Sequence, residues 1–249
     1  MIDVLRSEWT KIRSVRSTMW TLGTAGVLML AFGALMAVVV SGQSGGMEGL
    51  EPAGMSLTGL PFASLALATL GVLVISGEYR SGAIRTTLAA VPNRLELLTA
   101  KVVVFAAVAL VVSTVASFGA FFVSQAVFAR EGLSVALTEP GVFRAVVGAG
   151  LYLTASGLFG LALGALIRHT PGAIVMVIAL ILVLPSQTAM LPGEWGPFVH
   201  EHFTSNAGMR ITDVNPVGGL PPWQGFAVYL GWIAVTLVAA AVLLKKRDA

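Results

Sequence analysis

Cysteine is absent from the sequence, and charged residues are scarce. None of the 249 residues is Cys, and Asp, Glu, Lys and Arg together make up 11%, against roughly 25% in soluble domains. Without Cys the chain can form neither disulfides nor thiolate metal sites. With 56% hydrophobic residues and a mean hydropathy of +0.88, so little charge excludes a water-soluble globule. The composition predicts a helical integral membrane protein.

Several motifs of membrane enzymes and transporters are also missing. No Gly-x-x-x-x-Gly-Lys-Ser/Thr loop is present, so the chain is not expected to bind ATP by itself or to act as an enzyme. The 3 His residues lack the His-Glu-x-x-His spacing of metalloproteases. His200 and His202 lie two positions apart, where helical side chains diverge, so no metal site is expected. No Asp or Glu falls in the middle of an apolar run, which argues against an ion-coupled transporter.

Six apolar runs account for most of the chain. A helical span needs about 20 apolar residues, so the runs predict an all-α integral membrane protein that forms one transmembrane domain over residues 1–249. The expected spans are about 18–40, 57–76, 97–129, 141–167, 171–191 and 223–244. With both termini on one side, that side holds 12 of the 15 Lys and Arg residues and the other side holds 3, namely Arg130, Arg144 and Arg210. The positive-inside rule therefore places both termini in the cytoplasm.

The first 17 residues have the pattern of an amphipathic helix. Ile2, Leu5, Trp9 and Ile12 recur at steps of three and four and would form one apolar stripe. Such a helix is expected to lie in the inner membrane interface, attracted to anionic head groups. Its expected anchors are Trp9, Lys11, Arg13 and Arg16. The simpler alternative is a basic cytoplasmic flank that orients the first span.

Polar and small residues predict how three of the helices begin or pack. Asn93 followed by Glu96 predicts a helix start, and the helix would enter lipid near Lys101, whose side chain would extend to the head groups. Thr170 is expected to cap the fifth run, with a Pro behind it. The fourth run carries small residues that favour close helix packing, within one subunit or between two. These residues are Ala145, Gly148, Ser156, Gly160 and Gly164.

The fifth run is interrupted, and the segment that follows it is irregular. Pro removes a helix hydrogen bond that hydrocarbon cannot replace, so the break should be buried in protein or line a wet cavity. The candidate residues for a translocation path are Pro185, Ser186, Gln187 and Thr188. A simple proline kink is the alternative. Residues 192–222 mix aromatic and polar side chains and are expected to form short external helices that dip into the outer leaflet.

A polar interval at 77–96 separates the second and third runs and, on its charges, lies in the cytoplasm. Between Gly82 and Pro92, Ile84 and Leu88 would stand on one face of a short helix with Arg85 beside them. So short a helix is not stable alone in water and needs a groove to pack into. At the end of the second run, Glu78 is expected to pair with a nearby Arg and stiffen the interval.

The interval contains the pattern Glu-x-x-x-Gly-Ala-Ile-x-x-x-Leu-x-x-x-Pro-x-Arg. Together with the six spans and the basic tail, this pattern resembles the permease subunits of type-2 ABC exporters, in particular the small permeases of bacterial drug- and antibiotic-resistance exporters. The resemblance implies that the interval contains a coupling helix that docks on a separate ATPase. Its implied contact residues are Glu78, Arg80, Gly82, Ile84, Arg85, Leu88 and Pro92.

The resemblance also implies partners, cofactors and location. Two ATPase subunits, which carry ATP and Mg, would drive two permeases, either a homodimer or a pair of related chains, in the bacterial plasma membrane. The lipid bilayer is an expected partner and nucleic acid is not. The apolar chain suits export of an amphipathic or lipid-like compound or drug. The alternative is a non-transporting sensor or assembly module coupled to the same type of ATPase.

Overall fold

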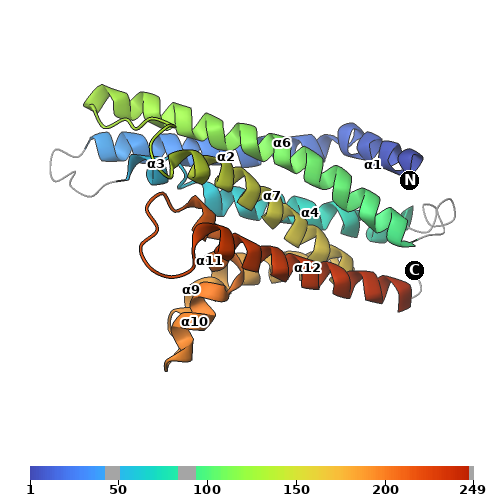
Figure 1. Cartoon of the computed structure of the whole chain (residues 1–249). Coiled ribbons are helices and arrows are strands. Elements are labelled where there is room, and N and C mark those ends of the chain that lie inside the picture. The colour runs from blue at the N-terminus through green and yellow to red at the C-terminus, as the bar shows by residue number, and fades with distance from the viewer. Residues whose placement is uncertain (43–50, 84–93, 247–249) are drawn as a thin grey trace.

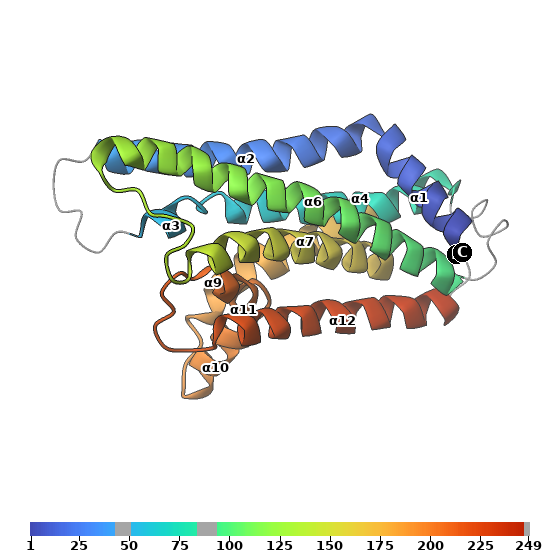
Figure 2. The ribbon, with the colours of Figure 1, turned by 45° about the horizontal axis from the view of Figure 1, so that its top comes forward.

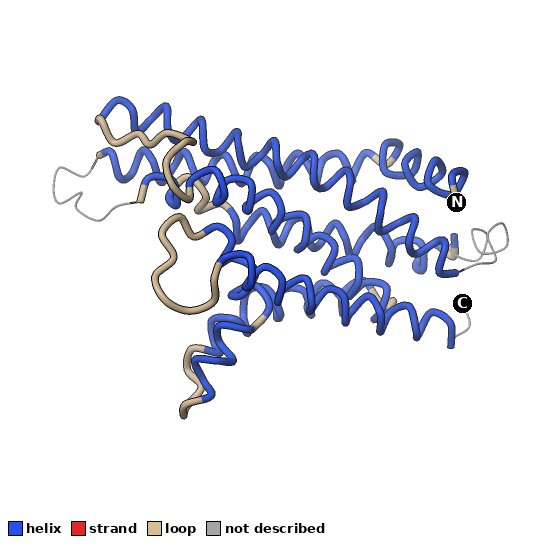
Figure 3. Tube along the Cα trace, viewed as in Figure 1, coloured by secondary structure: helices blue, strands red, loops and turns tan. Residues whose placement is uncertain are grey.

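The computed structural model of the chain describes residues 1–42, 51–83 and 94–246, and every regular element in these ranges is a helix (Figure 3). The long helices are α2 (Arg16–Ser41), α4 (Leu60–Ser81), α6 (Arg94–Phe128), α7 (Val142–Ile167) and α12 (Pro222–Lys246). The shorter helices are α1 (Ile2–Ser14), α3 (Pro52–Met55), α8 (Thr170–Ile178), α9 (Leu184–Thr188), α10 (Trp195–His202) and α11 (Thr204–Met209). Two 3₁₀ turns, η1 (Ala129–Glu131) and η3 (Arg210–Thr212), and a π-helical turn, η2 (Ala179–Val183), complete the described elements.

The prediction of six membrane-spanning helices is confirmed in number and character. Among the described residues, 6 helical segments are long and apolar enough: Arg16–Ser41, Pro52–Arg80, Arg94–Glu131, Val142–Ile167, Thr170–Thr188 and Pro222–Lys246. The described part of the third segment starts at Arg94, and α6 alone has 35 residues. Near its start, Glu96 Oε1 forms an ion pair with the terminal ammonium of Met1 at 2.5 Å. Asn93, the expected capping partner of Glu96, lies outside the described residues.

The long helices run side by side along one axis, and the start of α1 and the end of α12 lie at the same end (Figures 1 and 2). This end also carries Lys245 and Lys246, the last basic residues that the structure describes, and is called the basic end below. At the opposite end α9 and α10 project sideways from the bundle (Figure 1). The expected short helices of the segment before the last span are α10 and α11.

Helix α7 is the centre of the bundle. In its most apolar stretch 83% of residues are buried, against 22–56% in the other five segments. Small residues make this burial possible: a Cβ at Gly160 would collide with the carbonyl of Ala68, and one at Gly164 would meet the backbone of Val72 at 3.0 Å. Gly160 and Gly164 therefore pack against α4, and Gly148 packs against Ile211 of η3. These contacts lie within the chain, which is the first of the two expected uses.

The turn between α7 and α8 differs from the expected one. Arg168 adopts a left-handed conformation (φ 59°) and ends α7, so the extended residue that follows, His169, takes the cap position. His169 Nδ1 accepts from the Gly172 amide at 3.2 Å. The expected Thr170 cap is wrong, because Thr170 is the first residue of α8 and its hydroxyl donates to Ser76 Oγ at 2.9 Å.

Candidate functional site

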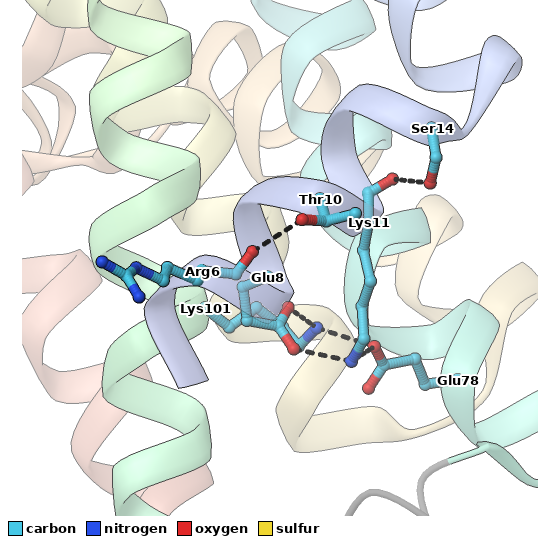
Figure 4. A network of polar contacts seen from close by, with 7 residues as sticks. All are labelled: Arg6, Glu8, Thr10, Lys11, Ser14, Glu78 and Lys101. Atoms are coloured by element: carbon cyan, nitrogen blue, oxygen red, sulfur yellow. Dashed lines mark hydrogen bonds and ion pairs between the residues drawn. The ribbon is translucent and has the colours of Figure 1, made fainter. Parts of the chain in front are cut away.

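Four charged side chains meet inside the basic end of the bundle (Figure 4). Lys101 Nζ of α6 donates to Glu8 Oε2 of α1 at 2.5 Å and to Glu78 Oε1 of α4 at 2.9 Å. Lys11 Nζ of α1 donates to Glu8 Oε1 at 2.7 Å and to Glu78 Oε1 at 2.9 Å. Glu8, Lys11, Glu78 and Lys101, here called the ionic cluster, therefore join three elements by four ion pairs.

The ionic cluster is buried and formally neutral. The side chains of Glu8 and Lys101 are 2% and 3% exposed, Glu78 is 13% exposed, and only Lys11, at 37%, reaches the surface. Charges taken out of water are tolerated only when they are paired and hydrogen-bonded. Each ammonium here bridges the two carboxylates, so both signs are balanced inside the site.

Burial lowers the pKa of Lys11, but its hydrogen bonds and charge interactions with Glu8 and Glu78 outweigh burial and leave that pKa above its ordinary value. Lys11 consequently stays charged throughout the physiological pH range. Near neutral pH Lys11 therefore keeps its ion pairs to Glu8 and Glu78, and the ionic cluster acts as an ionic joint between helices.

The local sequence explains how α1 reaches this position. Val15 is extended (φ −84°, ψ 105°) and separates α1 from α2. Helix α1 therefore turns away from the axis of α2 and lies against α6 and the end of α4 (Figure 2). Residues three apart on a helix share a face, so Glu8 and Lys11 both point at the ends of α4 and α6.

Only part of the expected apolar stripe of α1 is buried in the structure. Ile12 is buried and Leu5 is half-buried, whereas Ile2 and Trp9 are 69% and 51% exposed. Glu8 completes the buried side, because it pairs with Lys101. Among the expected interfacial anchors, Trp9, Arg13 and Arg16 lie on the exposed surface, and Lys11 lies in the ionic cluster.

One expectation for a charged residue is corrected. Lys101 does not extend toward head groups, because its ammonium turns inward to two carboxylates and the residue is 2% exposed. Glu78 pairs with two lysines of the described chain, and its expected pairing with a nearby arginine stays a prediction. Sequence reasoning missed Glu8 altogether. The available signal was an acidic residue three positions before Lys11 on the same face of the helix.

Comparison of the sequence with protein-family models and with curated proteins gives no match. The residues that carry the resemblance to ABC permeases are partly described. Arg80 is exposed, and Gly82 ends α4 in the left-handed conformation (φ 73°), which Gly adopts without strain. Ile84, Arg85, Leu88 and Pro92 lie outside the described residues.

A cavity of about 640 Å³ adjoins the ionic cluster between α1, α2 and α4. Its polar lining includes Lys11, Glu78 and Arg80, and its apolar lining includes Leu70 and Leu73. The basic end thus combines a rigid ionic joint with an adjacent space that is polar at one end and apolar at the other. Within the described part of the chain, no group of three or more His, Asp and Glu could hold a metal ion.

The interrupted fifth span forms a second polar region at the opposite end. The π-helical turn and Pro185 prevent the carbonyls of Leu180 and Ile181 from bonding as in a regular helix. Thr204 Oγ1 donates to the Leu180 carbonyl at 2.5 Å, and Ser205 Oγ donates to the Ile181 carbonyl at 2.8 Å. The break is therefore buried against protein, one of the two solutions that the sequence allowed.

The four path candidates face in two directions. Pro185 and Thr188 are buried toward α10 and α11, and Asn206 Nδ2 donates to the Pro185 carbonyl at 3.0 Å. Thr188 Oγ1 lies 2.9 Å from His200 Nδ1. Ser186 and Gln187 are exposed on the outer surface of this region.

Proposed function

We propose that the chain is the membrane-spanning permease subunit of an ATP-driven ABC exporter, powered by separate ATPase subunits that bind ATP and Mg. The observation that carries the proposal is the position of Glu78. This first residue of the permease-like pattern is bonded to Lys11 of α1 and to Lys101 of α6 at 2.9 Å each.

The ionic cluster supplies a route for mechanical coupling. A partner that displaces residues 78–92 would act on Glu78, and through it on the N-terminal helix and the third span together. Buried ion pairs of this kind cost several kcal/mol to break, so α1, α4 and α6 would move as one block and not separately. The two ends of the bundle would then alternate in opening as the ATPases close and separate.

The apolar surface of the described helices suits cargo that resembles lipid. The exported compound would be an amphipathic molecule or drug, and the dimer partner would be a second copy or a related permease. Both termini would lie in the cytoplasm of a bacterial cell, with the basic end inward, in agreement with the distribution of Lys and Arg.

The test uses the expected coupling helix. The tagged chain would be purified with its native complex, and Mg-dependent ATP hydrolysis and the co-purifying proteins would be measured. Ile84→Asp with Leu88→Asp should remove the ATPase and its activity while the chain still inserts in the membrane. Thr86→Asp with Ala90→Asp adds the same charge to the opposite helical face and should keep both.

The wild-type complex must hydrolyse ATP for the proposal to stand. Loss of hydrolysis in Ile84→Asp with Leu88→Asp, but not in the other double variant, supports docking of an ATPase on the face formed by residues 84 and 88. Equal retention in both double variants, or purification without any ATP-hydrolysing protein, would overturn the proposal. Export is tested separately by ATP-dependent accumulation of ethidium in inverted vesicles that carry the complex.

A further inference from the structure

The cavity beside the ionic cluster has a graded lining. At the basic end it is lined by Lys11, Glu78 and Arg80. Deeper along the bundle its walls are Leu70, Leu73 and Val74 of α4 and hydroxyl-bearing residues of α2. Leu73 is 38% exposed and Arg80 is exposed, so the cavity opens on the outer surface of the bundle between these residues, whereas Leu70 is buried.

The length of this lining matches half a bilayer. Leu70 and Arg80 are ten positions apart on α4, which corresponds to about 15 Å at 1.5 Å per residue. The hydrocarbon core of a bilayer is about 30 Å thick, so one leaflet contributes about 15 Å. A molecule with its charged group at Arg80 and its apolar part at Leu70 would therefore lie at the depth of a lipid in the cytoplasmic leaflet.

The charges favour an anionic head group. The lining holds three cations, Lys11, Arg80 and Lys101, and two carboxylates, Glu8 and Glu78, for a net charge of +1. Lys101 is buried between the carboxylates, but Lys11 is partly exposed and has a third proton beyond the two that it donates. Across residues 1–42, 51–83 and 94–246 no carboxylate pairs with Arg80.

We propose that this cavity binds one anionic phospholipid from the inner leaflet. The phosphate is held by Lys11 and Arg80, and one acyl chain lies along Leu70, Leu73 and Val74 between α2 and α4. The volume of about 640 Å³ lies within the range of roughly 300–1,000 Å³ for small-molecule sites and accommodates one chain with its phosphate. The cytoplasmic leaflet supplies anionic lipids. This site does not depend on the proposed ATPase.

The experiment measures lipid retained by the delipidated protein in detergent, by native mass spectrometry, after addition of phosphatidylglycerol or phosphatidylcholine. Wild type should retain one phosphatidylglycerol per chain in preference to phosphatidylcholine. Leu73→Trp fills the apolar part and should abolish this retention. Arg80→Ala should reduce the preference for phosphatidylglycerol about fivefold, the effect of one basic residue at an anionic surface.

Two matched variants control for non-specific effects. Val115→Trp places the same side chain at an exposed position of α6 that is outside the cavity, and Arg130→Ala removes an exposed arginine at the other end of the bundle. Both should retain phosphatidylglycerol as wild type does. Equal retention by Leu73→Trp and Val115→Trp, or equal binding of the two lipids by wild type, would overturn the proposal.

A photoreactive phosphatidylglycerol with a diazirine in its acyl chain gives a second readout on the unaltered chain. Cross-links to the peptide that contains residues 70–80, reduced by excess unlabelled phosphatidylglycerol, support the site. Cross-links confined to other helices contradict it. Leu73→Trp could instead dissociate a dimer without changing the amount of retained lipid. This outcome would show that a second copy of the chain occupies this surface, and it would also overturn the proposal.

Discussion

The ammonium of Lys101 lies 2.5 Å from Glu8 Oε2, although the two residues are 93 positions apart in the chain. Both side chains are almost fully buried. An N-terminal helix that could have remained on the membrane surface is thereby fixed to the third span. The contact makes α1 part of the bundle.

Lys101→Met should strongly destabilise the protein, because it removes the cation that is shared by Glu8 and Glu78. Breaking a buried ion pair from one side costs about 3–5 kcal/mol, whereas removing both charges costs less. Thermal unfolding in detergent of Lys101→Met, Glu8→Gln and the double variant measures the coupling. The double variant should be more stable than Lys101→Met alone, and simple addition of the two losses would contradict a direct pair.

The raised pKa of Lys11 predicts that the protein loses stability at alkaline pH. Its pKa in the folded protein is raised, so its stabilising contribution is complete below the ordinary value of 10.5 and is lost as the pH rises through the higher native pKa. The stability difference between wild type and Lys11→Met should be constant at neutral pH and should shrink above that value. Lys245→Met, at an exposed position, should show no such difference. A constant difference at all pH values would exclude the charge of Lys11 as its source.

Removal of the hydroxyls that serve the π-helical turn should destabilise the fifth span. Thr204→Val with Ser205→Ala leaves the buried carbonyls of Leu180 and Ile181 without donors, at about 1–3 kcal/mol each. The loss should appear as a lower unfolding temperature and as faster proteolysis between α8 and α11. Thr236→Val removes a hydroxyl that bonds within its own helix and should change little. Equal effects of the two changes would show that the π-helical turn needs no outside donor.

Gly160→Ala should disrupt the contact between α7 and α4, because a Cβ at this position collides with the backbone of Ala68. Overpacking costs about 1–3 kcal/mol and sometimes more. At Gly23 an added Cβ meets nothing within 4 Å, so Gly23→Ala controls for the change in residue type. Unfolding temperatures of the two purified variants provide the measurement. An unchanged Gly160→Ala protein would mean that α4 and α7 can move apart at little cost.

The six long apolar segments of the described chain and most of their bounds could be predicted from the sequence, because each span is a long apolar run that must satisfy its own backbone hydrogen bonds. The small residues of α7 likewise indicated close packing. The capping residue at the α7–α8 turn could not be predicted, since it depends on the left-handed conformation of Arg168. Pro185 indicated a break in the fifth span but did not indicate the π-helical turn.

The ionic cluster was the part least accessible to sequence reasoning. Lys101 stands at the end of a span and has the spacing of a residue that extends to head groups. Only the fold brings Glu8 and Glu78 to it, from positions separated by long apolar helices. The sequence drew attention to Glu78 and Lys11 but could not show that they contact each other, because charge pairs far apart in the chain leave no periodic pattern.

The bonds from Thr204 and Ser205 to the π-helical turn also limit the order in which the protein can be assembled. As the chain is synthesised, the fifth span ends at Thr188 and is complete before Thr204 and Ser205 emerge, because each donor follows its acceptor by 24 positions. Until then the carbonyls of Leu180 and Ile181 lack these donors, and hydrocarbon cannot supply others. The fifth span should therefore wait beside the insertion machinery, and enter lipid only together with α11.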